Sequence, residues 1–189
     1  MNKSQTKELK FSASRLKTKS SCSWVYYARY HLKLQDDTNA GALMGTCCHT
    51  IFESLTLPRR RKLFDKIVSA GTIADSAAIK LYVDKYLKKN QLAPDLFQKI
   101  DEMVMQGLKN DFFCEGGEIK GVELEFDLKG PGYRIYGLID RLIEYEKNYQ
   151  RIQDWKSSKK LFTDEELKDS IQAKMYSLYV RKTNPGAKP

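Results

Sequence analysis

The chain has 189 residues, of which 41% are hydrophobic and 30% charged, the length and composition of one globular domain rather than of a disordered chain. No apolar run approaches the roughly 20 residues that cross a bilayer, and residues 1–5 lack the core of a signal peptide, so we expect a cytoplasmic protein that does not bind membranes. The net charge of +9 favours a polyanionic partner, because each phosphate that Lys or Arg neutralises releases counterions.

The first part of the chain, residues 11–115, is predicted to be mainly helical. Ser12 or Ser14 is placed to cap one or two helices that extend to Leu34 and have an aromatic inner face. Apolar side chains at helical spacing predict further helices at residues 43–57, 73–89 and 95–113.

A basic segment follows directly after Pro58 and suits either a loop or the start of a helix. It contains Arg59, Arg60 and Arg61. These side chains either contact phosphates or only stabilise a helix end, and the sequence leaves both interpretations open.

The pattern changes in residues 116–182, where three strands and a helix are predicted. Residues 122–128 alternate between apolar and polar side chains, which is the period of a half-buried strand. Turns at 130–132 and 147–148 separate this strand from two more, which are expected at 133–145 and 149–156. Thr163 or Asp164 then caps a final helix from Glu165 to about Lys182, with Glu166 placed for a capping box. These elements form an antiparallel meander covered by helices, in one α/β (α+β) domain over residues 1–189.

Asp140, Asp154 and Lys156 are the residues best placed for chemistry. Alternate residues of a strand point to one face, so Asp154 and Lys156 share a side while Trp155 turns away. Asp140 lies as far before Lys147 as Asp154 lies after it, so a hairpin there brings the two carboxylates together. Such a pair favours a hard divalent cation, which polarises a phosphodiester and lowers the pKa of a bound water. A lysine beside that water can orient it and stabilise the developing negative charge.

The same residues also fit an ordinary role. Asp-x-Lys triplets are common, and charged residues on strands usually face water. Spacing alone therefore leaves catalysis and simple solvation as alternatives.

Four motifs occur in a specific order along the chain: Gly45-x-x-x-His49, Gly-Leu-Ile-Asp at 137–140, Asp-Trp-Lys at 154–156 and Gln172-x-x-x-Tyr176. Together with the opening segment 11–16 and Cys22, they resemble the RecB-type exonuclease domain of the PD-(D/E)xK nuclease superfamily. That domain also occurs in CRISPR adaptation nucleases, AddB-type repair subunits and phage exonucleases. The resemblance covers about residues 11–180. It implies a bacterial or phage protein with a restriction-endonuclease-like fold, in which a small mixed sheet is flanked by helices and the N-terminal half is helical.

The resemblance also implies a metal site. Asp140 and Asp154 would bind Mg²⁺ or Mn²⁺ together with His49 and the backbone carbonyl of Trp155. Lys156 would position the attacking water. A lone histidine on an apolar helix face is otherwise most often a packed, hydrogen-bonded side chain.

The same resemblance assigns Gln172 and Tyr176, which lie one helical turn apart, to orienting the DNA backbone. They also fit an ordinary amphipathic helix. Glu53 is a weaker candidate, as a partner that orients the histidine of the metal site, and Glu123 is weaker still.

The expected function is Mg²⁺- or Mn²⁺-dependent hydrolysis of DNA by an exonuclease, in recombination, repair or phage DNA processing. The main alternative is a DNA-binding module on the same fold that does not cut. A helical protein-interaction domain also fits the composition, but it does not account for the order of the motifs.

Two features depart from the family pattern. Many relatives hold an iron–sulfur cluster with one early and three late cysteines, whereas no cysteine follows Cys114 here, so we expect no cluster in this chain. The four cysteines are expected to be reduced, mostly structural thiols. Relatives also continue beyond the last helix, so this chain is expected to be either a minimal version or a fragment.

Overall fold

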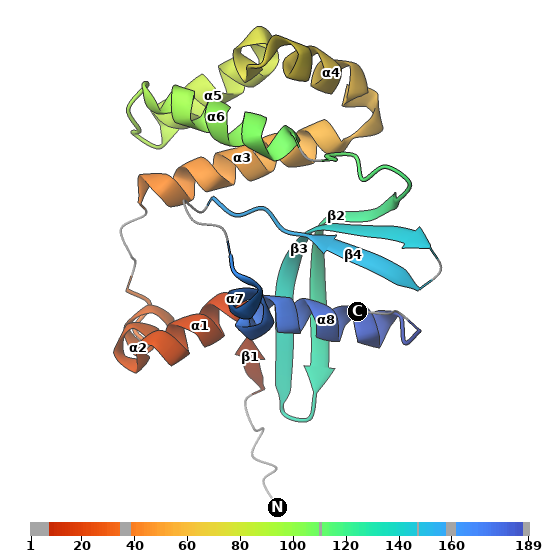
Figure 1. Ribbon diagram of the computed structural model, residues 1–189. Helices are drawn as coiled ribbons and strands as arrows, with labels where there is room; N and C mark the ends of the chain where they lie inside the picture. The colour runs from red at the N-terminus through yellow and green to blue at the C-terminus, as the bar shows by residue number, and fades with distance from the viewer. Residues whose placement is uncertain (1–7, 35–38, 110, 147, 158–161, 187–189) are drawn as a thin grey trace, which may run out of the picture.

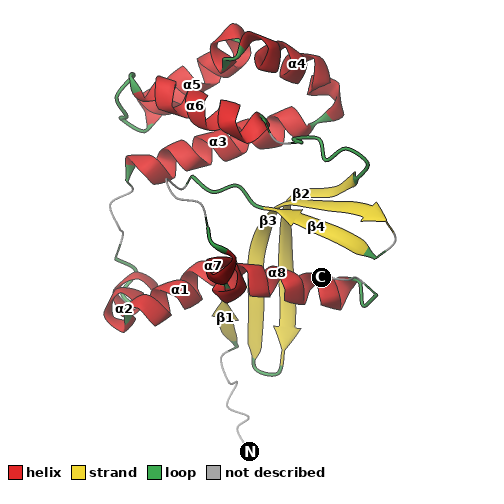
Figure 2. Ribbon diagram, in the orientation of Figure 1, coloured by secondary structure: helices red, strands yellow, loops and turns green. Residues whose placement is uncertain are grey.

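A computed structural model describes residues 8–34, 39–109, 111–146, 148–157 and 162–186. Four helices, α3 to α6, lie together on one side of a small sheet, while α8 crosses the lower part of its strands (Figure 1). Figure 2 shows the same division into a helical layer and a mixed helix–strand layer. Among the described residues, no helix has the length and apolar character needed to span a membrane. The predicted α/β class, with a small mixed sheet and a helical N-terminal half, is confirmed.

The N-terminal helices form a hairpin of α1 (Ala13–Ser21) and α2 (Ser23–Tyr30). Ser12 caps α1, as predicted, by accepting a hydrogen bond from the backbone N–H of Arg15. The guanidinium of Arg15 lies over the ring of Tyr30, 4.7 Å from its centroid. This cation–π contact holds the inner aromatic face of α2 against α1.

The helical layer encloses one hydrophobic core. The layer consists of α3 (Ala40–Thr56), α4 (Arg61–Ala70), α5 (Ala77–Lys89) and α6 (Leu96–Leu108). The sequence left the segment after Pro58 open; it forms the short 3-10 helix η1 (Pro58–Arg60) and then α4, which was not predicted as a full helix. The helix predicted at 73–89 is divided into η2 (Ile73–Asp75) and α5, because Ser76 is extended and caps α5.

The predicted antiparallel meander is present as β2 (Glu118–Gly130), β3 (Tyr133–Glu146) and β4 (Tyr149–Gln153). Position 147 of the predicted turn lies outside the described residues. A further strand, β1 (Leu9–Phe11), was not predicted; it pairs parallel with β3 and makes the sheet mixed.

The edge of β3 opposite β2 is paired only in part. Because β2 follows β3 along one edge, β1 and β4 share the other, β1 at residues 133–135 and β4 from residue 141 onward. Within the part of the chain that the structure describes, residues 136–140 therefore have no strand partner on that edge, and their peptide groups are available to other side chains.

The long β2–β3 hairpin changes direction midway (Figure 1). Within this hairpin Glu123 has a φ of 48° and no Cα partner in the β3 register, whereas Val122 pairs with Arg141 and Leu124 with Ile139. The left-handed conformation costs a residue with a side chain about 1–2 kcal/mol. Such conformations persist where the surrounding structure imposes them, and they cluster at functional sites.

The final predicted helix is two helices, α7 (Asp164–Asp169) and α8 (Ile171–Thr183). Thr163 and Glu166 form the predicted capping box of α7. The break arises because Ser170 is extended and its hydroxyl accepts from the backbone N–H of Ala173, which starts a new helix. The apolar face of α8 then packs on β2 and β3, which positions its polar residues at the unpaired edge of β3.

Candidate active site

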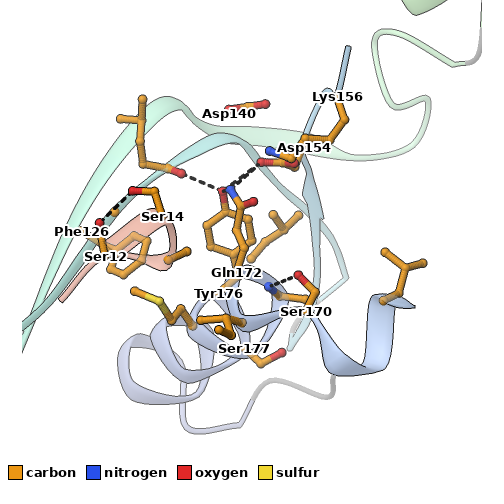
Figure 3. A pocket seen from close by; sticks show the side chains of 18 of the residues that line it. Ser12, Ser14, Phe126, Asp140, Asp154, Lys156, Ser170, Gln172, Tyr176 and Ser177 are labelled. Atoms are coloured by element: carbon orange, nitrogen blue, oxygen red, sulfur yellow. Dashed lines mark hydrogen bonds and ion pairs between the residues drawn. The ribbon is translucent and has the colours of Figure 1, made fainter. Parts of the chain in front are cut away.

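An open cavity of about 1270 Å³ lies between α8, the start of α1 and the unpaired stretch of β3 (Figure 3). Its wall includes six polar residues singled out by the sequence motifs: His49, Asp140, Asp154, Lys156, Gln172 and Tyr176. The three arginines at positions 59–61 do not line it. One of them, Arg61, is exposed and lies 3.1 Å from Asp65 and 4.1 Å from the ring centroid of Phe113.

His49, Glu123 and Asp140 form an acidic group with three ligand atoms within 4.8 Å of one another. Nδ1 of His49 lies 3.5 Å from Oδ2 of Asp140 and 3.9 Å from Oε1 of Glu123. The three residues come from α3, β2 and β3. Gly45, one turn before His49, lets α3 lie close to the segment after β4, because a Cβ there would lie 3.0 Å from the hydroxyl of Ser157. Nitrogen and carboxylate ligands so close together are a donor set that fits a divalent cation.

The backbone of Trp155 contacts both Asp140 and His49. Its N–H donates to Oδ2 of Asp140 at 2.8 Å, and its carbonyl lies 3.1 Å from Nε2 of His49. Because a carbonyl only accepts, this contact requires a proton on Nε2, and Nδ1 is the ring nitrogen that faces the two carboxylates. The two carboxylates lie close together beside this ring, an arrangement that a cation stabilises.

The sequence predicts a strand through Asp154 and Lys156, but this prediction is wrong, because β4 ends at Gln153. The hairpin register is nevertheless the predicted one: Arg141 pairs with Gln153, which places Asp140 and Asp154 just beyond the last pair. Trp155 turns away from the cavity, as predicted, and its indole stacks on Phe52 of α3 at 4.8 Å between ring centroids. The prediction of the faces therefore holds although the strand ends earlier.

Asp154 is held by three side chains (Figure 3). Nζ of Lys156 lies 2.5 Å from its Oδ2, while the amide of Gln172 donates to its Oδ1 at 3.1 Å. The hydroxyl of Tyr176 lies 2.9 Å from the same Oδ1 and 2.8 Å from the carbonyl of Leu138, in the unpaired stretch of β3. Gln172 and Tyr176 thus fix this carboxylate against the sheet, and their contact with a DNA backbone stays a prediction.

Arg141, the neighbour of Asp140, is fully buried between the sheet and the helical layer. It donates to the backbone carbonyl of Phe112 and to the side chains of Thr56 and Gln153. Its guanidinium lies 4.7 Å from the ring centroid of Trp155 and 4.5 Å from that of Phe112. No carboxylate contacts it among the described residues, so neutral acceptors and aromatic faces hold this buried cation.

The carboxyl groups of buried Asp140 and half-buried Glu123 are costly to ionise. Burial, and next the charge of Asp154, raise the pKa of Asp140, although the hydrogen bond from Trp155 opposes this. Burial, and next the charge of Asp140, raise the pKa of Glu123. Both shifts have the same two causes, which are first the loss of solvation and then the negative charge of a neighbouring carboxylate.

We therefore expect Asp140→Asn to raise the thermal midpoint of the chelator-treated protein by several degrees at neutral pH. Since the pKa of Asp140 is raised by folding, its ionisation destabilises the folded chain as the pH rises through that pKa; below about pH 4 the carboxyl is neutral in both states. The gain should consequently vanish in acid. Circular dichroism melts in EDTA across a pH series measure it, with the exposed Asp169→Asn as control. A lower midpoint for Asp140→Asn at every pH would contradict the argument.

Glu123 was ranked too low from the sequence. Counting outward from the turn at 130–132 places it opposite Asp140, just as counting from 147 places Asp154 there. Glu53, considered as the partner that orients His49, is exposed, and the two ring nitrogens of His49 instead face Asp140, Glu123 and the Trp155 carbonyl.

The family of the chain follows from its similarity to known proteins. Neither the curated proteins nor the solved structures compared with the chain gave a significant match. The profile that describes the PD-(D/E)XK nuclease superfamily matches residues 10–189, a range that contains all four motifs and every residue of the acidic group. The chain therefore belongs to the PD-(D/E)XK nuclease superfamily.

Proposed function

We propose that this protein is a Mg²⁺- or Mn²⁺-dependent deoxyribonuclease that hydrolyses phosphodiester bonds. The observation that carries the proposal is the convergence of His49, Glu123 and Asp140 beside the Asp154–Lys156 pair in one cavity. The superfamily acts on nucleic acid and is typically dependent on a divalent metal, which agrees with the donor set.

Asp140, Glu123 and Nδ1 of His49 would hold the cation, with Asp154 at the adjacent side of the site. A bound divalent cation polarises the phosphodiester and lowers the pKa of water. The carbonyl of Trp155, which the resemblance assigns to the metal, lies against Nε2 of His49, so we assign it to orienting the ring.

Lys156 supplies a positive charge at the cavity. Its ammonium lies 2.5 Å from Asp154 and its side chain is 42% exposed, so it can contact both that carboxylate and a phosphate group. There it would orient the attacking water and stabilise charge in the transition state. Because Gln172 and Tyr176 hold the other oxygen of Asp154, the pair is fixed in position before substrate binds.

An exonuclease of the RecB type, acting in recombination, repair or phage DNA processing, is supported by the order of the four motifs. The non-cleaving alternative is disfavoured, because Asp140, Asp154 and Lys156 are all retained and all line the cavity.

The test compares linear end-labelled DNA, covalently closed circular DNA and linear RNA, each with Mg²⁺, Mn²⁺ or EDTA. We expect metal-dependent digestion of the linear DNA, with release of small labelled products and little change in the circle or the RNA. Binding without digestion in either metal would instead establish the non-cleaving module. Cutting of the closed circle would overturn the exonuclease assignment while leaving the nuclease.

A further inference from the structure

The outer face of α2 carries three stacked rings: Trp24, Tyr27 and His31. The ring centroids of Trp24 and Tyr27 lie 5.9 Å apart with 26° between the planes, and those of Tyr27 and His31 lie 5.3 Å apart with 20°. Trp24 is 70% exposed and Tyr27 44%. We call these three residues the ring platform. The fold does not bury them, because the inner face of α2 already packs on α1.

The surroundings of the ring platform are strongly basic. Residues 9–34 contain no Asp or Glu and six cationic residues: Lys10, Arg15, Lys17, Lys19, Arg29 and Lys33. An exposed aromatic face alone does not identify its occupant, but this charge disfavours basic and neutral protein surfaces and favours a polyanion. Flat rings within a basic field are what successive bases of a single strand bind.

The ring platform is also connected to the cavity. The first turns of α1 contribute Ser12, Ser14 and Lys17 to the cavity wall. Helix α1 has 9 residues, about 13 Å at 1.5 Å per residue, and α2 begins immediately after Cys22. A strand that enters the cavity therefore has a short basic path to the rings.

We propose that the ring platform binds unpaired bases of single-stranded DNA near the bond that is cut. The proposal rests on the proposed function and adds a preference for single-stranded substrate. In a duplex the base faces are stacked within the helix, so only an unpaired segment can place its bases on Trp24 and Tyr27. The basic residues of α1 would then contact the phosphates between the rings and the cavity.

The protein contains only two tryptophans, which makes the stacking measurable. Trp155 packs against Phe52 and Phe112, whereas Trp24 is exposed, so stacked bases should quench mainly Trp24. We expect saturable quenching by oligothymidine in EDTA, where no cleavage occurs, and much less by a duplex of equal length. The quenching should disappear in Trp24→Phe, which removes the reporter, and persist in Trp155→Phe.

Affinity is measured by the anisotropy of labelled oligonucleotides. The double variant Trp24→Ala/Tyr27→Ala should weaken single-strand binding by at least about 10-fold and leave duplex binding nearly unchanged. Tyr149→Ala, which removes a similarly exposed ring from β4, is the matched control. Circular dichroism verifies that each variant is folded.

Two outcomes would overturn the proposal. One is unchanged single-strand affinity in the double variant, or an equal loss for duplex. The other is a change of sedimentation mass without a change in DNA binding, which would assign the rings to contacts between copies of the chain. Because binding is measured in EDTA, the result does not depend on whether the protein has nuclease activity. A protein that cleaves DNA but whose ring platform does not affect single-strand binding would contradict this proposal and leave the proposed function intact.

Discussion

Asp154→Asn is expected to lower the rate of DNA cleavage by about 10²–10⁴-fold while DNA binding stays close to wild type. Oδ2 of Asp154 contacts Lys156 and its Oδ1 contacts Gln172 and Tyr176, so the charge is fixed beside the acidic group. Removing the charge weakens both the metal site and the placement of the lysine. Lys156→Ala should cause a loss of similar size. Affinity should persist, because it comes from Lys and Arg residues dispersed over the surface.

The measurement is single-turnover cleavage of end-labelled DNA in Mg²⁺, alongside anisotropy in EDTA. The chain provides a matched control in Asp169 and Lys174, an exposed acid–base pair 3.4 Å apart near the junction of α7 and α8. Asp169→Asn and Lys174→Ala should cleave at the wild-type rate. Cleavage by Asp154→Asn at the wild-type rate would show that Asp154 is not needed for the reaction.

Arg141→Ala is expected to reduce the free energy of unfolding by about 3–5 kcal/mol. The side chain is fully buried, and its removal leaves a void and deprives the carbonyl of Phe112 and the hydroxyl of Thr56 of a donor. It also removes the cation from the faces of two rings. A domain is typically stable by only about 5–15 kcal/mol, so this loss is a large part of the total.

Urea unfolding followed by circular dichroism gives the value directly. Arg141→Met is the informative companion, because it fills most of the volume and removes only the donors and the charge. We expect its loss to be clearly smaller than that of the alanine variant. A loss below about 1 kcal/mol for alanine would mean that water replaces the guanidinium and hydrogen-bonds to the groups that it leaves.

The geometry of strands and turns is sufficient to predict the centre of the site from the sequence. The hairpin count joined Asp140 to Asp154, and the alternation of side chains sent Trp155 to the opposite side, because both depend on strand geometry over a few residues. The capping residues Ser12 and Thr163 were also predicted from the sequence for the same reason.

Long-range and irregular features were not predicted. Strand β1 is three residues long and pairs with a strand more than a hundred residues later, so no period reveals it. The turn at 130–132 places Glu123 opposite Asp140, but its left-handed φ is not predicted by its residue type. Arg141 is an arginine that composition would place in water, and only the meeting of three elements supplies its partners.

Trp155 belongs to two parts of the molecule at once. Its peptide group touches Asp140 and His49, while its indole lies in the packing of the helical layer against Phe52 and Phe112. Interiors are close-packed, so a change of volume at either phenylalanine moves the indole and, through it, the peptide group. Natural selection on the reaction therefore extends into the hydrophobic core, and these two positions should tolerate fewer replacements during evolution than foldability alone would allow.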